Sequence, residues 1–308
     1  RAAFNGPVPV AGTALVLPTS FSGQGAAAVR LANGRFLETT GTTTAGIQEA
    51  INHLGADGGV VYLSAGEYEI KTTIEWNPDD DETNLGNIAL IGDASASTKI
   101  IMTSGPLGTE EDEVPMLVFD AVGLAEGPPY GNITVKNITF QNDGFKAINN
   151  GQRGHCITLG NIIRAEISNC VFTGVFPTGI DPDDEGVGMT VGIGAGVYIR
   201  GDVSSDIRIV NNAFEGLACG IWARDGERIL IQGNICRLNS GAGILALLAP
   251  TGADDPAGTS LFSLSIIGNT CNDNLGDGIQ AGVAYSAGKS GVVIMGNTCS
   301  ANGDGSNF

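Results

Sequence analysis

The chain has 308 residues and a net charge of -18, from 33 acidic and 15 basic side chains. So acidic a surface repels nucleic acids and anionic membranes, and no apolar run is long enough to span a bilayer, so neither a nucleic-acid partner nor membrane insertion is expected. The 47 glycines, about twice the usual share, indicate many tight turns.

The first elements are unlike the rest of the chain. Residues 1–42 show no convincing period and could be an irregular first set of strands, a linker or the end of a preceding domain. Residues 44–54 predict a helix, because Ile47, Ala50, Ile51 and Leu54 share one helical face. Residues 59–63 and 68–70 then predict short strands, so the helix can cap the open end of a solenoid.

One short motif recurs along the rest of the chain, as apolar-x-apolar-x-(Asn or Gly)-x-x-(Phe or Cys). Its anchors are Gly92, Asn137, Asn169, Asn211, Gly233, Gly268 and Gly296. Its last positions are Ser95, Phe140, Phe172, Phe214, Cys236, Cys271 and Cys299, and the polar Ser95 makes the first copy the weakest. A repeat this short cannot bury an apolar face alone, so the copies must stack, with loops inserted at turns.

The segment GIQEAINHLGADGGVVYLSAGEYEI at residues 46–70, followed by these coils, resembles the pectin-lyase-like superfamily. The resemblance implies an all-β fold, a right-handed parallel β-helix with an N-terminal α-helical cap, over residues 43–308. That superfamily includes polysaccharide lyases and hydrolases, alginate epimerases and bacteriophage tailspikes. It therefore implies an extracellular or virion-surface location and a polysaccharide partner. If the protein is a tailspike, the resemblance also implies a homotrimer. The last coil, after Cys299, does not go on to a further strand as its predecessors do, so either a partner chain or a further domain covers this end, or the chain has been cut.

Two structural columns follow from stacking. Asn212, Asn234, Asn269 and Asn297 are expected to form a hydrogen-bonded amide ladder at one bend. The thiols of Cys236, Cys271 and Cys299 share the column of the inward phenylalanines. They are predicted to be buried, and their parallel directions disfavour disulfides.

A candidate binding face lies on the strands after each Phe or Cys position. Alternation sends Tyr198, Trp222, Leu245 and Gln280 outward in one column, and Arg200 and Arg224 in the next. Aromatic rings beside arginines can hold the apolar face and the hydroxyl or carboxylate groups of a sugar. Each part of this prediction has an alternative. Tyr198 and Trp222 could lie under an inserted loop, and Arg200 and Arg224 could pair with Asp202 and Asp225 instead of a ligand.

The catalytic candidates are carboxylates near that face. Glycoside hydrolysis needs two, and neighbouring coils supply the required spacing, so Asp202 and Asp225 with Asp183 or Asp184 are the predicted set. Asp181, Asp183 and Glu185 could bind Ca²⁺, with a solvated loop tip as the alternative, and no other cofactor is indicated. His155 could be catalytic, although a structural histidine is the favoured interpretation. The functional prediction is a polysaccharide-binding β-helix that could also cleave its ligand; the alternative is a non-catalytic adhesion spike.

Overall fold

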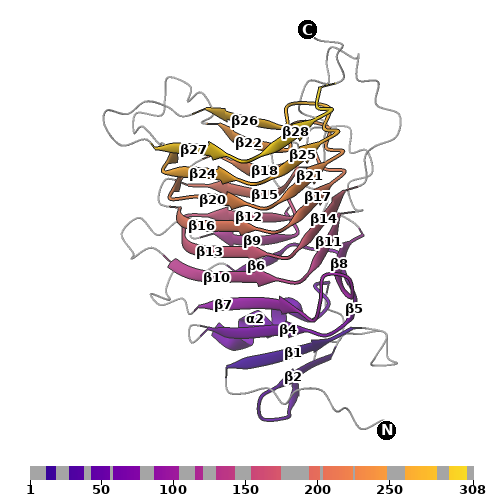
Figure 1. The fold of residues 1–308 in the computed structure, drawn as a ribbon. Helices are drawn as coiled ribbons and strands as arrows, with labels where there is room; N and C mark the ends of the chain where they lie inside the picture. The colour runs from indigo at the N-terminus through magenta and orange to yellow at the C-terminus, as the bar shows by residue number, and fades with distance from the viewer. Residues whose placement is uncertain are drawn as a thin grey trace.

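The fold was analysed in a computed structural model. It describes residues 12–18, 28–37, 43–55, 58–76, 87–103, 115–120, 130–142, 154–174, 194–201, 204–224, 226–247, 261–282 and 291–303. Within these ranges the strands wind into successive coils that stack along one axis (Figure 1). The structure is a right-handed parallel β-helix, as the sequence predicts.

Three sheets run along the rod. Sheet A contains β1 (Thr13–Leu17), β2 (Ala28–Leu31), β3 (Phe36–Leu37), β4 (Gly59–Leu63), β7 (Ile88–Gly92), β10 (Tyr130–Lys136), β13 (Ile162–Ser168), β16 (Ser205–Val210), β20 (Leu230–Gln232), β24 (Leu264–Ile267) and β27 (Val292–Met295), with β19 (Gly226–Glu227) and β23 (Leu261–Phe262) beside them. Sheet B contains β5 (Gly66–Ile70), β8 (Thr98–Met102), β11 (Thr139–Asn142), β14 (Val171–Gly174), β17 (Ala213–Glu215), β21 (Ile235–Arg237), β25 (Thr270–Asn272) and β28 (Thr298–Ser300). Sheet C contains β6 (Ile74–Trp76), β9 (Leu117–Asp120), β12 (Ile157–Gly160), β15 (Ala195–Arg200), β18 (Cys219–Ala223), β22 (Ile244–Leu247) and β26 (Ile279–Gly282).

The N-terminal end is closed by a helix and a hairpin. Helix α2 (Ile47–Leu54) buries the four residues that the sequence assigns to its apolar face and ends at Gly55. Strand β1 pairs in parallel with β4 and antiparallel with β2, which pairs with β3. Part of the N-terminal segment therefore belongs to the same sheet as the coils.

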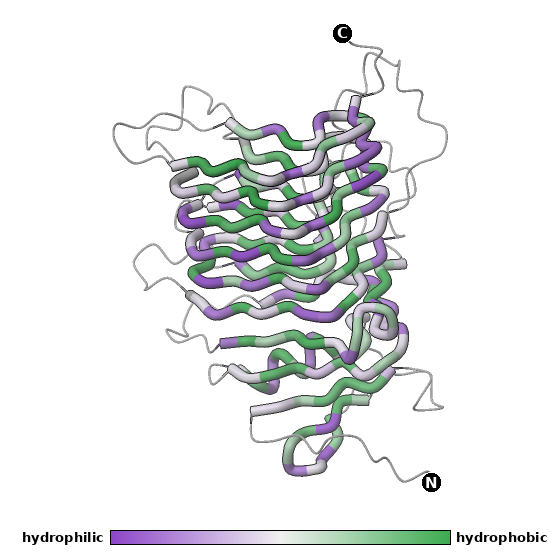
Figure 2. Tube along the Cα trace, viewed as in Figure 1, coloured by the Kyte–Doolittle hydropathy of each residue, from purple (hydrophilic) through white to green (hydrophobic). Residues whose placement is uncertain are grey.

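The core is built from columns of equivalent residues, and apolar and polar residues alternate along each coil (Figure 2). In sheet B one column runs Tyr68, Ile100, Phe140, Phe172, Phe214, Cys236, Cys271 and Cys299. The interpretation of Ser95 as the first member was wrong. Ile100 pairs with Phe140 because the turn after Gly92 is longer in that coil.

Left-handed backbone bends turn the chain between sheets. The anchors Asn137, Asn169, Asn211, Gly233, Gly268 and Gly296 all have φ between 54° and 67°. A second column at the start of the sheet A strands, Asn132, Arg164, Asp206, Arg228 and Ser263, has φ between 52° and 65°. Asparagine and glycine tolerate this conformation best, which explains why the anchors are these two residues.

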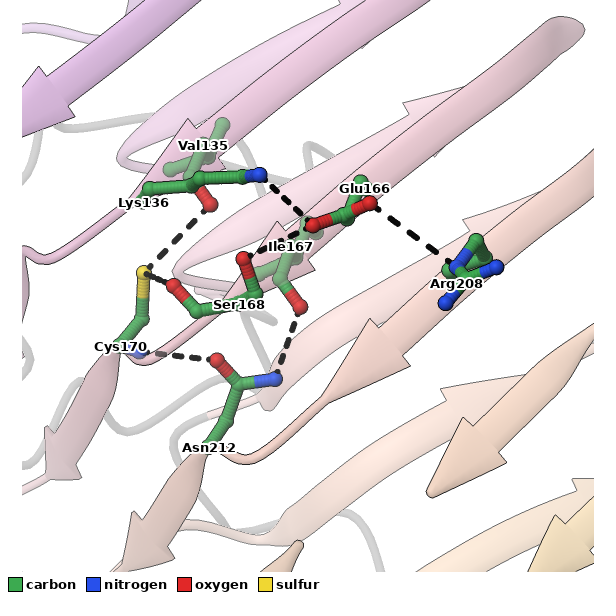
Figure 3. A network of polar contacts seen from close by, with 8 residues as sticks. All are labelled: Val135, Lys136, Glu166, Ile167, Ser168, Cys170, Arg208 and Asn212. Carbon is green, nitrogen blue, oxygen red and sulfur yellow. Dashed lines mark hydrogen bonds and ion pairs between the residues drawn. The ribbon is translucent and has the colours of Figure 1, made fainter. Parts of the chain in front are cut away.

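The predicted asparagine ladder is present at the bend between sheets A and B. Asn234 Oδ1 accepts the backbone N–H of Asn212 at 3.0 Å and its side-chain N–H at 3.1 Å, and Asn269 and Asn297 repeat the pattern. Each side-chain amide also donates to a strand carbonyl, as Asn212 does to Ile167 (Figure 3). At its first rung, Asn212 Oδ1 accepts the Cys170 N–H at 2.9 Å.

A second ladder, which the sequence analysis did not predict, lies at the bend after sheet B. Asn274 Oδ1 accepts the backbone and side-chain N–H groups of Asn239, and Asn302 does the same for Asn274. Asn239 and Asn274 are almost completely buried. These bonds satisfy polar groups inside the rod, where an unpaired amide would be costly.

All six cysteines are free thiols, and Cys236 and Cys271 are buried, as predicted for these two. The prediction that Cys299 is also buried was wrong: it is exposed, because it lies in the last described coil. The thiols in this column therefore act as core side chains wherever another coil covers them.

The outer face of sheet A carries ion pairs between coils (Figure 3). Lys136 Nζ lies 2.8 Å from Glu166 Oε1, and Arg208 Nε lies 3.9 Å from the other oxygen of Glu166. The hydrogen bond from Lys136 lowers the pKa of Glu166 below its usual value. These groups are partly exposed, so each pair contributes little to stability.

Candidate functional site

The predicted outward column on sheet C is present. The registers align Glu75, Val118, Thr158, Tyr198, Trp222, Leu245 and Gln280, one residue per coil. The flanking residues Val197 and Ile199 are buried in the main core, whereas Tyr198 belongs to a separate apolar cluster. Alternation along the strand therefore places this column on the outside of the sheet.

Three rings meet on this outer face. The ring centroid of Tyr198 lies 4.5 Å from that of His155 and 4.7 Å from that of Trp222. His155 and Trp222 are 6.2 Å apart in an edge arrangement. These separations are in the range where aromatic pairs attract one another, so the rings fix each other's orientation.

The rings differ in their access to solvent. Tyr198 is only 2% exposed, although it points outward, whereas Trp222 is partly exposed. Ala195, Cys219, Ala242 and Leu245 complete the buried cluster that contains Tyr198, and Trp222 packs against it. Tyr198 thus packs beside Trp222 on the adjacent coil, and Trp222 is the ring with part of its surface open to solvent.

His155 has a structural position in this cluster. It is completely buried, and its Nδ1 accepts the backbone N–H of Ala195 at 2.8 Å. A neutral imidazole that accepts at Nδ1 carries its proton on Nε2. This contact fixes the first residue of β15 and agrees with the favoured interpretation of His155 as a structural histidine.

A charged pair flanks the rings. Arg200 Nη2 lies 2.7 Å from Asp120 Oδ2, and the Asp120 side chain is only 8% exposed. The registers place Asp120, Gly160 and Arg200 in one column, so the pair spans the intervening coil above Gly160. A Cβ at Gly160 would lie 2.3–2.6 Å from three atoms of the Asp120 carboxylate group. Glycine is therefore required at position 160 for the two side chains to meet.

Gly160→Ala is expected to disrupt this pair and to lower the free energy of unfolding by about 1–3 kcal/mol, because an added methyl group must displace a buried carboxylate. The measurement is the midpoint of chemical denaturation. Gly291→Ala is the control, since its Cβ would meet no atom within 4 Å. Equal losses in both variants would contradict the role given to Gly160.

The structure brings together four of the predicted site residues. Tyr198, Trp222 and Arg200 lie on adjacent coils, and Arg224 follows β18, with its backbone N–H bonded to the Ile199 carbonyl at 3.0 Å. The predicted carboxylates lie outside the described residues: Asp181, Asp183, Asp184, Glu185, Asp202 and Asp225. Their catalytic and Ca²⁺-binding roles stay predictions.

Asp120, Gly160 and Thr158 were not among the site residues predicted from the sequence. The strands Leu117–Asp120 and Ile157–Gly160 pair in parallel register with the coil of Ala195–Arg200, so Val118 and Thr158 share the column of Tyr198. Extending the alignment to these two strands would have placed Asp120 opposite Arg200, two coils apart. The position of Asp120 could therefore have been found from the sequence. These two strands were left out of the alignment because they do not begin with the glycine that marks the other strands of the set.

The described residues of this face include two groups that could act as nucleophiles, Asp120 and Cys219. Asp120 is held in an ion pair, and burial raises the pKa of the Cys219 thiol to about 12, so Cys219 is not a thiolate nucleophile at neutral pH. No group of three or more potential metal ligands occurs among the described residues. The described groups on this face are a partly exposed indole ring, the Asp120–Arg200 ion pair and the buried hydroxyl groups of Thr158 and Tyr198.

Comparisons with known proteins add the following findings. No family model matches the sequence, and no curated protein does. The structure is similar to the Dettilon tailspike protein, with 16% identity, a TM-score of 0.48, and coverage of 84% of this chain and 47% of that one. The catalytic unit of a GH87 α-1,3-glucanase from Streptomyces thermodiastaticus matches with 14% identity, a TM-score of 0.47, and coverage of 97% and 48%.

The surface adhesin PfbA of Streptococcus pneumoniae matches with 13% identity, a TM-score of 0.40, and coverage of 82% and 81%. The fold is the one that the pectin-lyase-like resemblance implies. This chain spans about half the length of the tailspike and glucanase chains that it matches. Among the described residues, no helix is long and apolar enough to cross a membrane.

Proposed function

We propose that the outer face of sheet C around Trp222 binds a polysaccharide at an extracellular or virion surface. The observation that carries the proposal is the partly exposed Trp222 ring, held by Tyr198 and flanked by the Asp120–Arg200 pair. An indole face can cover the apolar C–H surface of a sugar, while charged groups bond its hydroxyl or carboxylate groups. Parallel strands hold these groups in place before the ligand arrives, which limits the entropy lost on binding.

The net charge of the protein restricts the class of polysaccharide that this face can bind. A net charge of -18 opposes indiscriminate binding of polyanions. Arg200, which is paired with Asp120, and Arg224 lie two residues after Tyr198 and Trp222 on adjacent strands. A neutral glycan, or one with spaced rather than dense carboxylates, therefore suits this face best.

Cleavage of the bound polysaccharide is the finer part of the proposal. In this part of the proposal, Asp202 and Asp225, with Asp183 or Asp184, are the acid–base or nucleophile residues. The reaction is either hydrolysis or a lyase elimination. A non-catalytic adhesion role uses the same binding face without them. A homotrimer is proposed only as the assembly that the tailspike resemblance implies.

The test is binding to a panel of neutral and uronate polysaccharides, with and without Ca²⁺. Trp222→Ala is expected to weaken binding of the tightest ligand about 30-fold, because a central tryptophan contributes about 2 kcal/mol to many interfaces. Tyr62→Ala is the matched control, since Tyr62 is 42% exposed on sheet A. It is expected to change binding less than twofold.

Two further variants separate the alternatives. Trp222→Phe keeps a ring in the cluster and should retain part of the affinity, which distinguishes lost binding from lost folding. Asp225→Asn tests cleavage by release of reducing ends. Binding that survives in Trp222→Ala but fails in Tyr62→Ala would move the site to sheet A and refute the proposal.

A further inference from the structure

The Asp120–Arg200 pair lies beside the column of outward residues that contains Trp222. Arg200 follows Tyr198 by two residues in β15, so both side chains lie on the outer face of sheet C. Tyr198 in turn pairs in register with Trp222 on the next coil. A polysaccharide that covers Trp222 and runs along this face toward the N-terminal coils would therefore pass beside Arg200, with one sugar near the ring and another near the pair.

The two side chains of the pair differ in their access to solvent. The side chain of Arg200 is 37% exposed, whereas that of Asp120 is 8% exposed. Arg200 Nη2 donates to Asp120 Oδ2 at 2.7 Å, across Gly160, whose missing side chain leaves room for the carboxylate. A ligand on the outer face therefore contacts the guanidinium group, while the carboxylate acts on the ligand mainly through its charge.

This arrangement distinguishes a hydroxyl group of a ligand from a carboxylate group. A guanidinium group has five N–H donors, and the bond to Asp120 uses one of them. A sugar hydroxyl that accepts from Arg200 carries no charge, so the carboxylate of Asp120 does not repel it. A uronate carboxylate at the same place would face a second negative charge across the guanidinium group, where burial of Asp120 weakens screening by solvent. Repulsion between the two carboxylates then offsets the attraction of Arg200.

We propose that Asp120 is a specificity-determining residue, which makes this face bind a neutral sugar in preference to a uronate beside Arg200. The proposal rests on polysaccharide binding at Trp222 and names the ligand class at the neighbouring position. Arg200 donates to hydroxyl groups of the sugar, and Asp120 both orients the guanidinium group and compensates its charge. Arg224 lies one coil further from Asp120, so the selection applies to the sugar beside Arg200 and not to the whole face.

Matched pairs of oligosaccharides test this selection. Each pair is a uronate oligosaccharide and its carboxyl-reduced form, in which neutral hydroxymethyl groups replace the carboxylates. Isothermal titration calorimetry of the unchanged protein is expected to show binding of the reduced form at least about tenfold tighter than that of the uronate form. This measurement does not depend on the folding of a variant. A preference for the uronate form, or no binding of either form in any pair, would overturn the proposal.

Asp120→Asn removes the negative charge and keeps the size of the side chain. The variant is expected to bind the uronate form about tenfold more tightly than the unchanged protein does, with little change for the reduced form, because the repulsion is removed. Combination with Arg200→Gln should abolish this gain, since the gain requires the guanidinium charge. A gain that persists in the double variant would contradict the roles given to both residues.

Glu166→Gln is the matched control, since it makes the same change in net charge on the outer face of sheet A, where Glu166 pairs with Lys136. It is expected to leave the ratio of the two affinities unchanged, and a gain equal to that of Asp120→Asn would refute a local role of Asp120. Trp222→Ala separates this proposal from polysaccharide binding itself. If neither form depends on Trp222, binding at this face fails, and the role of Asp120 fails with it. If both forms depend on Trp222 but Asp120→Asn leaves their ratio unchanged, only the role of Asp120 fails.

Discussion

Asn234→Leu is expected to lower the free energy of unfolding by about 2–4 kcal/mol, because several buried hydrogen bonds are lost at once. Asn234 is completely buried in the middle of the first ladder. Its Oδ1 accepts two N–H groups of Asn212, and its Nδ2 donates to the Ile209 carbonyl and to Asn269. Leucine has a similar size, so the loss reports unsatisfied polar groups more than a cavity.

The measurement is denaturant unfolding followed by circular dichroism. Asn272→Leu is the control: Asn272 lies on the outer face of β25 and accepts one hydrogen bond, from Ser300. The control is expected to change stability by less than about 0.5 kcal/mol. If both variants unfold at the midpoint of the unchanged protein, the ladder does not stabilise the coils.

Phe172→Ala is expected to cost about 3–5 kcal/mol, the range for removing a buried aromatic side chain from a core. Phe172 is fully buried between two other rings. Its centroid lies 5.2 Å from that of Phe140 and 4.7 Å from that of Phe214, with nearly parallel planes. Alanine leaves a cavity between two coils and removes both stacking contacts.

The same denaturation experiment tests this variant. Phe36→Ala serves as control, because Phe36 is 60% exposed in β3. A loss of stability no larger than in the control would mean that the coils do not depend on the stacked rings. Thermal unfolding should rank the two variants in the same order.

Stacking made much of the fold predictable from the sequence. When equivalent residues lie one above another, a shared position in the repeat becomes a column in space. The phenylalanine column and the ladder from Asn212 to Asn297 could therefore be assigned from the repeat alone. Ser95 shows the limit of that reasoning. The turn after Gly92 is longer than in the other coils, so Ile100 and not Ser95 occupies the phenylalanine column. The place of a residue in a column depends on strand pairing, and counting residues from the anchor finds it only where the turns have equal length.

The candidate face was predictable only in part. Alternation placed Tyr198 and Trp222 on the outside of sheet C, and the registers confirm that column. Pattern alone could not show that Tyr198 is covered, because burial on an outer face depends on contacts from other parts of the chain. Nor did it find the partner of Arg200, since Asp120 lies 80 residues earlier and two coils away.

The most direct test of the account is oxidative footprinting of the protein with and without its tightest polysaccharide ligand, read residue by residue by mass spectrometry. The account predicts slower oxidation of Trp222 in the complex, while Tyr62 on sheet A and Met295 at the C-terminal end of the rod react as before. Unchanged oxidation of Trp222 together with protection of Tyr62 would contradict it, because the ligand would then occupy another face of the β-helix.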